Sequence, residues 1–370
     1  SILCGIKSLP ALIAGRLLIG LAMSLLGLNL PAYFREIPPP NLRGAIGGFH
    51  QLQFGIGTTV AFTLSLGLPE PTEANRDNDY WRLMFWFTAL LAVIQLIGYF
   101  TVFRFDTPKS LWQHGKHEEA ERVLKKLQTD DEVQVSLNSL RIVEKEVSKL
   151  GFKDLKLKEN YHPVLIGFGV ILAMNFGGIS SIFMYSTDLF ASVDSEGSNK
   201  DQVMATFLYV GITNLLACIM GFILGAKIRR RVMFMLGFGG CTLAGFTISL
   251  ADTIDASWMV KVGVLIFIIA FEVGGGSLMW TYCAEIMEPE FLVGPRLCHW
   301  VTLFINGLII IMMFNSLGIS TTFLIFAIVN IIAAWFTIRL LPETRGLTSE
   351  QIKDLFKPAR EPVAKADIVQ

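Results

Sequence analysis

Charged side chains are scarce in this sequence. Asp, Glu, Lys and Arg make up 17% of its 370 residues, whereas an ordinary soluble domain has about 25%. Hydrophobic residues make up 52%. The 31 basic and 31 acidic side chains balance, so the net charge gives no indication of a nucleic-acid partner. The composition favours a protein whose surroundings are largely apolar.

The missing charges leave long apolar windows along the chain. Seven windows hold no Asp, Glu, Lys or Arg: 17–34, 44–69, 83–103, 163–187, 202–226, 232–251 and 297–338. An eighth, 262–284, holds only Glu272. About 20 mostly apolar residues cross a bilayer as a helix, and the longest window has room for two helices with a turn near 315–320. Apolar residues are continuous in these windows, whereas in the strands of a membrane β-barrel they alternate with polar residues. The sequence therefore predicts an all-α membrane protein with nine transmembrane helices.

Other features are absent as well. The five cysteines lie mostly in apolar windows, and we interpret them as small buried thiols rather than as disulfides or metal ligands. "SILCGIKSLP" (1–10) has no basic segment before an apolar core, so it is not typical of a signal peptide. It looks like the end of an earlier helix, which suggests that the sequence is part of a longer chain. No Ser-His-Asp, metal or phosphate-loop set stands out, so neither an enzyme nor a cofactor is predicted.

The segments between the windows alternate in charge. Segments 35–43, 104–161, 227–231 and the tail from Arg339 are basic. The acidic segments are 69–80, 188–201 and 252–261. The positive-inside rule places the basic segments, and with them the C-terminus, in the cytoplasm.

One segment has the pattern of small amphipathic helices. "GKHEEAERVLKKLQ" (115–128) and "NSLRIVEKEVSKLG" (138–151) show helical spacing with Glu/Lys pairs on their polar faces. We expect two or three short helices here, packed on the cytoplasmic ends of the membrane helices. "GFGG" (237–240) has no preceding strand, so we interpret it as small-residue helix packing rather than as a dinucleotide loop.

An ordered set of motifs then points to a family. "GRLLIGLAMSLLGLNLPAYFREIPPPNLRGAIGGFHQLQFGIG" (15–57) resembles the fourth and fifth helices of the sugar porter family in the major facilitator superfamily. The matching positions are Gly15, Arg16, Pro31, Tyr33, Glu36, Pro38, Arg43, Gly44 and Gln51. Later segments resemble further family motifs: "YWRLMF" (80–85), "FDTPKSL" (105–111), "GGISSIFMYS" (177–186), "KIRRR" (227–231), "FEVGGGSLMWTYCAEI" (271–286) and "PETRG" (342–346).

The resemblance implies a twelve-helix bundle of which roughly the first three helices are not in this sequence. By it, 1–104 holds helices four to six, 105–161 a cytoplasmic helical linker, 162–341 the C-terminal six-helix half, and 342–370 a cytoplasmic tail. The implied function is a multi-pass carrier, expected in the plasma membrane. It would move a hexose-like monosaccharide or a related polyol by alternating access, either facilitatively or coupled to protons.

In this family, charges near the cytoplasmic helix ends form networks that hold that side shut. The corresponding residues here are Glu36, Arg43, Lys109, Arg230, Arg231, Glu285 and Glu343. The prolines at 38–40 would end the fourth helix at a defined place. Simple topogenic charge is the alternative; it explains the arginines but not the glutamates mixed among them.

A sugar needs amides that both donate and accept hydrogen bonds, and an aromatic surface for its C–H face. Polar side chains inside apolar windows are the candidates, and the resemblance selects Gln51, Asn175, Ser180, Asn214, Trp280 and Asn306. Each amide could instead only bond a neighbouring helix, and Trp280 could belong to an interfacial belt. Arg16 lies beside an apolar window, and Glu272 lies within one. For each charge two interpretations stay open: a role in transport, or a structural hydrogen bond between helices.

The sequence departs from the family pattern around this expected pocket. Met174 and Asn175 replace a pair of glutamines, and Ser180 replaces an asparagine. Residues 274–277 read Gly-Gly-Gly-Ser where the family has Gly-Pro-x-Pro, so a bend there would depend on glycine. The segment after Glu285 is about four residues longer than usual. Two alternatives follow: a sugar sensor or degenerate paralogue that does not transport, and a carrier of another organic solute.

Overall fold

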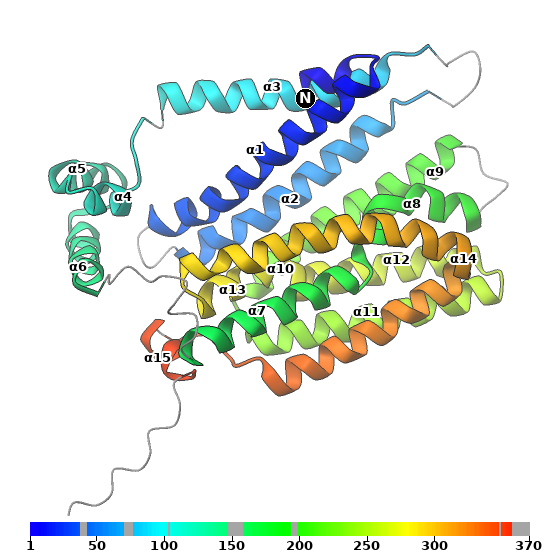
Figure 1. Ribbon diagram of the computed structural model, residues 1–370. Coiled ribbons are helices and arrows are strands. Elements are labelled where there is room, and N and C mark those ends of the chain that lie inside the picture. The colour runs from blue at the N-terminus through cyan, green and yellow to red at the C-terminus, as the bar shows by residue number, and fades with distance from the viewer. Residues whose placement is uncertain are drawn as a thin grey trace, which may run out of the picture. The chain divides into compact units, whose positions relative to one another are not determined.

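The computed structural model describes residues 1–37, 43–69, 77–102, 104–146, 158–193, 199–347 and 349–356. Within these ranges every regular element is a helix (Figure 1). The chain divides into two compact units. One comprises Ser1–Ser148 with Ser186–Phe222, and the other comprises Lys149–Tyr185 with Ile223–Gln370. The all-helical architecture agrees with the sequence prediction.

The first unit contains three long helices: α1 (Leu9–Glu36), α2 (Arg43–Ser65) and α3 (Tyr80–Thr101), preceded by the short 3-10 helix η1 (Ile2–Gly5). To these it adds α9 (Asn199–Ala205), the π-helical turn η4 (Thr206–Ile212) and most of α10 (Thr213–Gly225). The hydroxyl of Thr59 on α2 donates to the carbonyl of Gly211 at 2.8 Å, and Gly211 lies against Phe62. The absence of a side chain at Gly211 lets η4 approach α2 closely.

The linker of the first unit forms three short helices: α4 (Pro108–Gln113), α5 (His117–Leu127) and α6 (Asp130–Glu146). The predicted helix at 115–128 is confirmed. The second predicted helix, 138–151, was placed too late, because α6 begins at Asp130. The cause is a capping box: the Glu132 carboxylate accepts from the backbone N–H and the hydroxyl of Thr129, at 3.1 and 2.9 Å.

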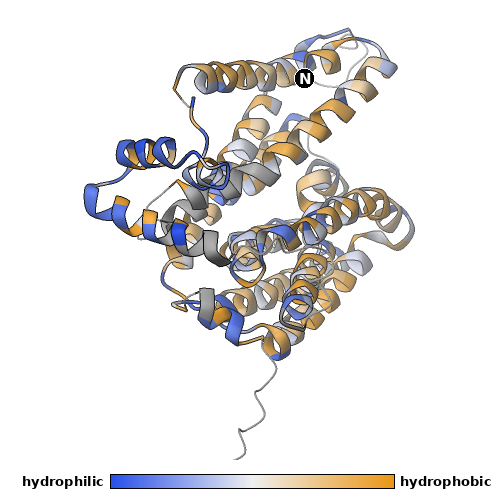
Figure 2. Ribbon diagram, turned by 60° about the vertical axis from the view of Figure 1, so that its left-hand side comes forward, coloured by the Kyte–Doolittle hydropathy of each residue, from blue (hydrophilic) through white to orange (hydrophobic). Residues whose placement is uncertain are grey.

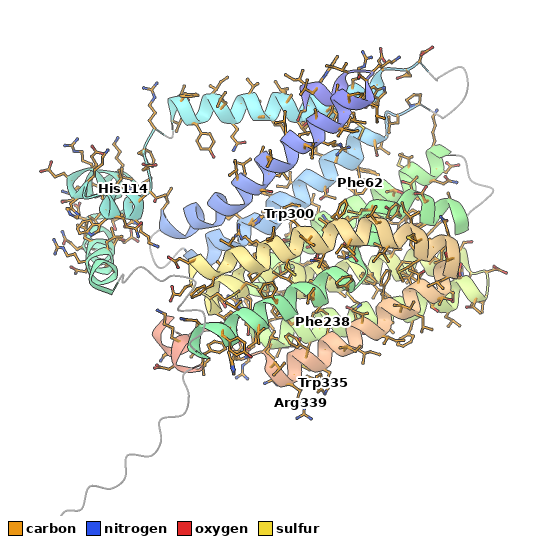
Figure 3. The ribbon with its side chains drawn as sticks, viewed as in Figure 1. Phe62, His114, Phe238, Trp300, Trp335 and Arg339 are labelled. Carbon is orange, nitrogen blue, oxygen red and sulfur yellow. The ribbon has the colours of Figure 1, made fainter. Side chains whose placement is uncertain are left out.

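The second unit is built from α7 (Lys158–Phe176), the first part of α8 (Ile179–Val193), α11 (Arg230–Thr253), α12 (Ser257–Phe271) and α14 (Val293–Leu340). Short elements connect or flank these helices: η5 (Glu272–Gly276), α13 (Met279–Ile286), η6 (Pro289–Leu292) and α15 (Ser349–Asp354). The turn η6 lies in the segment after Glu285, and the extra length of that segment relative to the family stays a prediction. Phe238 on α11 is buried in the core of this unit, whereas Trp335 on α14 is 58% exposed and points outward (Figure 3).

Glycines set the closest helix contact in this unit. A Cβ on Gly274 would lie 2.3 Å from the Cα of Gly237, and a Cβ on Gly240 would lie 2.4 Å from the Cβ of Ala270. The interpretation of "GFGG" as small-residue packing is thereby confirmed. Residues Glu272–Gly276 form a π-helical turn, so the chain departs from a regular α-helix at the glycine run, where the sequence analysis expected any bend to depend on glycine.

Seven helical stretches of the described residues are long and apolar enough to cross a membrane. One of them, Glu290–Leu340, spans 51 residues and is broken at Gly318, where φ is +77°. This break lies in the predicted turn at 315–320. None of the apolar part of Tyr80–Thr101 is buried inside the protein. The long helices are mostly hydrophobic, whereas the linker helices α4–α6 are mostly hydrophilic (Figure 2). The count of nine spans stays a prediction.

Candidate functional site

Four of the predicted network charges lie together at one end of the second unit. We call Arg230, Arg231, Glu285 and Glu343 the charge cluster. A guanidinium nitrogen of Arg230 donates to Glu285 at 3.0 Å, and the two side chains are 14% and 24% exposed. The same guanidinium also donates to the carbonyl of Gly225 at 2.5 Å. Because the pair is largely shielded from water, its attraction is screened less than that of a surface pair.

Glu343 caps a helix rather than pairing with one cation. Helix α11 begins at Arg230, and its N-cap residue, Arg229, makes no side-chain capping bond. The Glu343 carboxylate accepts instead from the backbone N–H groups of Arg230 and Arg231, at 2.9 and 3.2 Å. The first N–H groups of a helix have no partner within it and carry the positive end of the helix dipole. The carboxylate therefore ties the end of α14 to the start of α11.

Further bonds fasten the segment after α14 to the same place. The Thr344 hydroxyl donates to the second oxygen of Glu285 at 2.6 Å. Arg345 donates to the carbonyls of Ala226, at 2.9 Å, and Lys227, and Arg231 donates to the carbonyl of Ile338. The motifs "KIRRR" and "PETRG", more than 100 residues apart in the sequence, are thus one structural unit.

The other predicted network residues lie elsewhere. Lys109 is on α4 in the first unit. Glu36 ends α1 and Arg43 begins α2, but their side chains lie outside the described residues. The share of these three in a network remains a prediction.

In the second unit, two predicted pocket amides bond to each other's helices. The Asn175 side-chain nitrogen on α7 donates to the Thr302 hydroxyl on α14 at 2.6 Å. The Asn306 side-chain nitrogen donates back to the carbonyl of Asn175 at 2.7 Å. Both asparagines are 5% exposed. These bonds use one donor nitrogen of each amide to join α7 to α14.

Ser180 is buried just past the break between α7 and α8. Gly178 sits at this break with φ of +105°, a conformation that favours glycine. Asn330 holds the break in place: its side-chain nitrogen donates to the carbonyls of Gly177 and Phe326, both at 2.8 Å. Asn330 was not among the predicted residues. In the sequence, Asn330 is an amide side chain inside an apolar window. The selected asparagines have the same feature, so it does not distinguish Asn330 from them.

Trp280 is half-buried on α13, among polar and charged neighbours. The Arg296 guanidinium lies 5.1 Å from the centre of its ring, and the His299 ring lies edge-on at 5.2 Å. Arg296 belongs to the "GPR" segment (294–296), but sequence reasoning gave it no role. A cation over an indole ring is a favourable contact, so Arg296 fixes the orientation of the tryptophan.

In the first unit, Gln51 and Asn214 reach the same side chain. The Gln51 side-chain nitrogen on α2 lies 4.0 Å from the sulfur of Cys218, and that sulfur lies 4.0 Å from the Asn214 side-chain oxygen on α10. Asn214 is fully buried, and its side-chain nitrogen has no hydrogen-bond partner among the described residues. A buried donor without a partner costs about 1–3 kcal/mol, which marks Asn214 as a group able to gain from a ligand.

The two predicted intramembrane charges have different surroundings. Arg16 is exposed on α1, with its guanidinium 5.1 Å from the centre of the Phe85 ring. Glu272 is 0% exposed and begins the π-helical turn η5. Its carboxylate lies beside Gly276, where a Cβ would come within 3.0 Å of an oxygen. The roles of both charges remain predictions.

Comparisons with known proteins agree with the motifs and with the helical architecture. The profile of the family described as "Sugar (and other) transporter" matches residues 1–356. The facilitated glucose transporter member 3 of solute carrier family 2 from Ovis aries is 31% identical over 368 residues, which cover 95% of this chain and 71% of that protein. The major myo-inositol transporter IolT of Bacillus subtilis is 27% identical over 373 residues, covering 97% and 77%.

Among solved structures, the xylose transporter XylE from E. coli in a partially occluded inward-open conformation matches with a TM-score of 0.75. It is 21% identical, and the match covers 92% of this chain and 72% of that one. The fold is therefore that of the major facilitator superfamily. The chain belongs to the sugar (and other) transporter family, and the membership predicted from its motifs is confirmed.

Proposed function

We propose that this protein is a multi-pass membrane carrier that moves a monosaccharide or a related polyol by alternating access. The family match over residues 1–356 is the observation that carries the proposal. Relatives described as glucose and myo-inositol transporters support this substrate class. All of them are carriers, so the expectation that the protein is not an enzyme agrees with its family.

Each unit offers polar groups to a substrate. In the first unit, the unpartnered nitrogen of Asn214 is available to a sugar hydroxyl, and Gln51 reaches the same sulfur. In the second unit, Trp280 supplies an aromatic face held by Arg296. The side-chain nitrogens of Asn175 and Asn306 join α7 to α14. Their side-chain oxygens would accept hydrogen bonds from the substrate. Ser180 is the small polar group beside them.

The charge cluster would act as a latch in the conformational cycle. Its bonds join the start of α11, the end of α13 and the segment after α14. Several such bonds together are worth a few kcal/mol, enough to bias an equilibrium between two conformations. Glu36, Arg43 and Lys109, which belong to the first unit, remain proposed members of the cytoplasmic charge network. On this proposal the cluster lies on the cytoplasmic side of the plasma membrane, as its arginines indicate.

The direct test is uptake of labelled hexoses, xylose and myo-inositol into proteoliposomes that contain the full-length protein, with and without a proton gradient. Saturable uptake of at least one polyol is expected. Acceleration by the gradient would identify proton coupling, and its absence would identify facilitated diffusion. Binding of a sugar without flux would instead support the sensor, and absence of both would overturn the proposal.

A further inference from the structure

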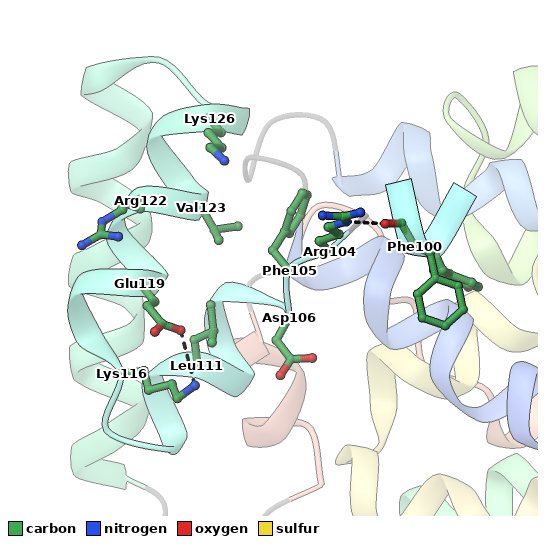
Figure 4. A pocket seen from close by; sticks show the side chains of 11 residues that line it. Phe100, Arg104, Phe105, Asp106, Leu111, Lys116, Glu119, Arg122, Val123 and Lys126 are labelled. Atoms are coloured by element: carbon green, nitrogen blue, oxygen red, sulfur yellow. Dashed lines mark hydrogen bonds and ion pairs between the residues drawn. The ribbon is translucent and has the colours of Figure 1, made fainter. Parts of the chain in front are cut away.

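A hollow of about 700 Å³ lies between the last turn of α3 and the linker helices α4 and α5 (Figure 4). All of its lining residues belong to the first unit. Its apolar and aromatic lining comes from Tyr99, Phe100, Phe105, Leu111 and Val123. Its charged lining comes from Arg104, Asp106, Lys116, Glu119, Arg122 and Lys126. The proposed transport cycle uses none of these residues.

The sequence places this hollow at a membrane surface. Tyr80–Thr101 is a candidate membrane span, and two of the lining aromatics, Tyr99 and Phe100, belong to its last turn. Aromatic side chains with a polar neighbourhood gather at the level of lipid headgroups. Arg104 follows directly, and its guanidinium donates to the carbonyl of Phe100 at the end of the helix. The hollow therefore opens where the hydrocarbon region ends and headgroups begin.

The charges of the lining do not cancel. Lys116 is paired with Glu119 at 3.4 Å. The remaining cations are Arg104, Arg122 and Lys126, with Asp106 as the remaining anion. Within the described part of the chain, Arg122 and Lys126 form no salt bridge. Figure 4 shows Arg104 and Lys126 on opposite sides of the hollow and Arg122 on the outer side of α5.

The arrangement on α5 is unfavourable for the helix by itself. Arg122 and Lys126 are four residues apart and exposed, and like charges at this spacing destabilise a helix. On the neighbouring face, the same helix pairs Lys125 with Glu121 at 2.7 Å. The two basic residues of α5 that line the hollow, Arg122 and Lys126, thus add positive charge to it without forming a salt bridge within the described part of the chain.

We propose that this hollow binds the headgroup of an anionic phospholipid that carries a phosphomonoester. A phosphomonoester has a charge of about −1.5 to −2 at pH 7, which matches the excess of the three cations Arg104, Arg122 and Lys126 over Asp106. Arginine offers paired donors to phosphate oxygens. The apolar lining suits the glycerol and the first acyl carbons. Basic residues immediately beyond a membrane helix are typical of sites for anionic lipids. The lipid is not the transported solute, so this site goes beyond the proposed function.

The test measures binding to the purified full-length protein in detergent by native mass spectrometry. Three probes are titrated: dioctanoyl phosphatidylinositol 4-phosphate, dioctanoyl phosphatidylinositol and inositol 1,4-bisphosphate. The monophosphorylated lipid should bind most tightly. The double variant Arg122→Gln/Lys126→Gln should weaken its binding roughly 20- to 30-fold, about fivefold for each basic residue. The helix should stay folded, because the two substitutions remove a repulsion.

Lys125→Gln is the control for position, since it removes one positive charge from the same helix but Lys125 does not line the hollow. It should change the dissociation constant of the monophosphorylated lipid by less than about twofold, because exposed charges are well screened. If Lys125→Gln weakened lipid binding as much as the double variant does, the proposed location of the site would be wrong. If phosphatidylinositol bound as tightly as the monophosphorylated lipid, the proposed recognition of a phosphomonoester would be wrong. Equal binding of inositol 1,4-bisphosphate would show that a soluble phosphate, not a lipid, is the ligand.

Discussion

The carboxylates of the charge cluster and the side-chain amide of Asn214 differ in their hydrogen bonding. In the charge cluster, the carboxylate oxygens of Glu285 and Glu343 all accept hydrogen bonds from the chain. In the region around Asn214, the side-chain nitrogen of this residue is buried without a partner among the described residues. A satisfied polar group stabilises one conformation, whereas an unsatisfied one gains when a ligand arrives. On the proposed function, the first region is a latch and the second contributes to substrate binding.

The largest effect is expected when the cap of α11 is removed. Glu343→Ala leaves the backbone N–H groups of Arg230, Arg231 and Arg345 without their acceptor. Hydrogen bonds to charged groups contribute about 1.5–3 kcal/mol, so the free energy of unfolding should fall by about that amount. Chemical denaturation of the purified protein in mixed micelles measures it.

Glu343→Gln serves as the control for charge. It keeps one acceptor oxygen but loses the interaction with the helix dipole, so its loss should be about half as large. Sugar affinity should stay unchanged in both variants. If both were as stable as the natural protein, the latch would be wrong and the cluster would only orient the chain in the membrane.

Two buried asparagines sharpen the comparison directly. Asn214→Ala should weaken sugar binding by about 1–3 kcal/mol, a fivefold to hundredfold rise in the dissociation constant, with little loss of stability. Asn330→Ala should do the reverse, because its side-chain nitrogen already bonds two carbonyls. Equilibrium sugar binding and chemical denaturation of both variants check this. Similar behaviour of the two variants would contradict the distinction between satisfied and unsatisfied amides.

Removing the aromatic face should have a smaller effect. Trp280→Leu is expected to weaken sugar binding about threefold to tenfold, as stacking contributes about 0.5–1.5 kcal/mol. Trp280→Phe keeps a ring and should keep most of the affinity. Gln51→Ala tests the polar groups of the first unit and should resemble Asn214→Ala. If sugar affinity were unchanged in both Trp280→Leu and Gln51→Ala, the proposed binding residues would be wrong.

The smallest effect is expected from an exposed ion pair in the linker. The hydrogen bond from Lys125 lowers the pKa of Glu121, and the attraction of the same cation lowers it further. The stabilisation is therefore present above the pKa of Glu121 in the unfolded chain and is lost as the pH falls through the lower folded value. Glu121→Gln should remove this small acid sensitivity of α5. Hydrogen exchange of α5 between pH 3 and 6 measures it, and an unchanged pH profile would count against the pair.

The sequence alone determined the class of the protein. Charge-free windows of about 20 residues are decided by composition, because unpaired charges are costly in a bilayer. The order of short motifs, such as the one from Gly15 to Gln51, then identified the family without any knowledge of contacts. The glycines of "GFGG" (237–240) could be interpreted as packing sites, since the alternative required a strand that the pattern lacks.

Tertiary structure decided which polar groups are already used. Asn175, Asn214, Asn306 and Asn330 look alike in the sequence, each an amide within an apolar window. Three of them donate to another segment of the chain, and the nitrogen of Asn214 does not. Such bonds join residues more than 100 positions apart, so local pattern carries no information about them. In the same way, only the fold shows that Glu343 meets the first N–H groups of α11, because a helix end attracts a carboxylate from any part of the chain.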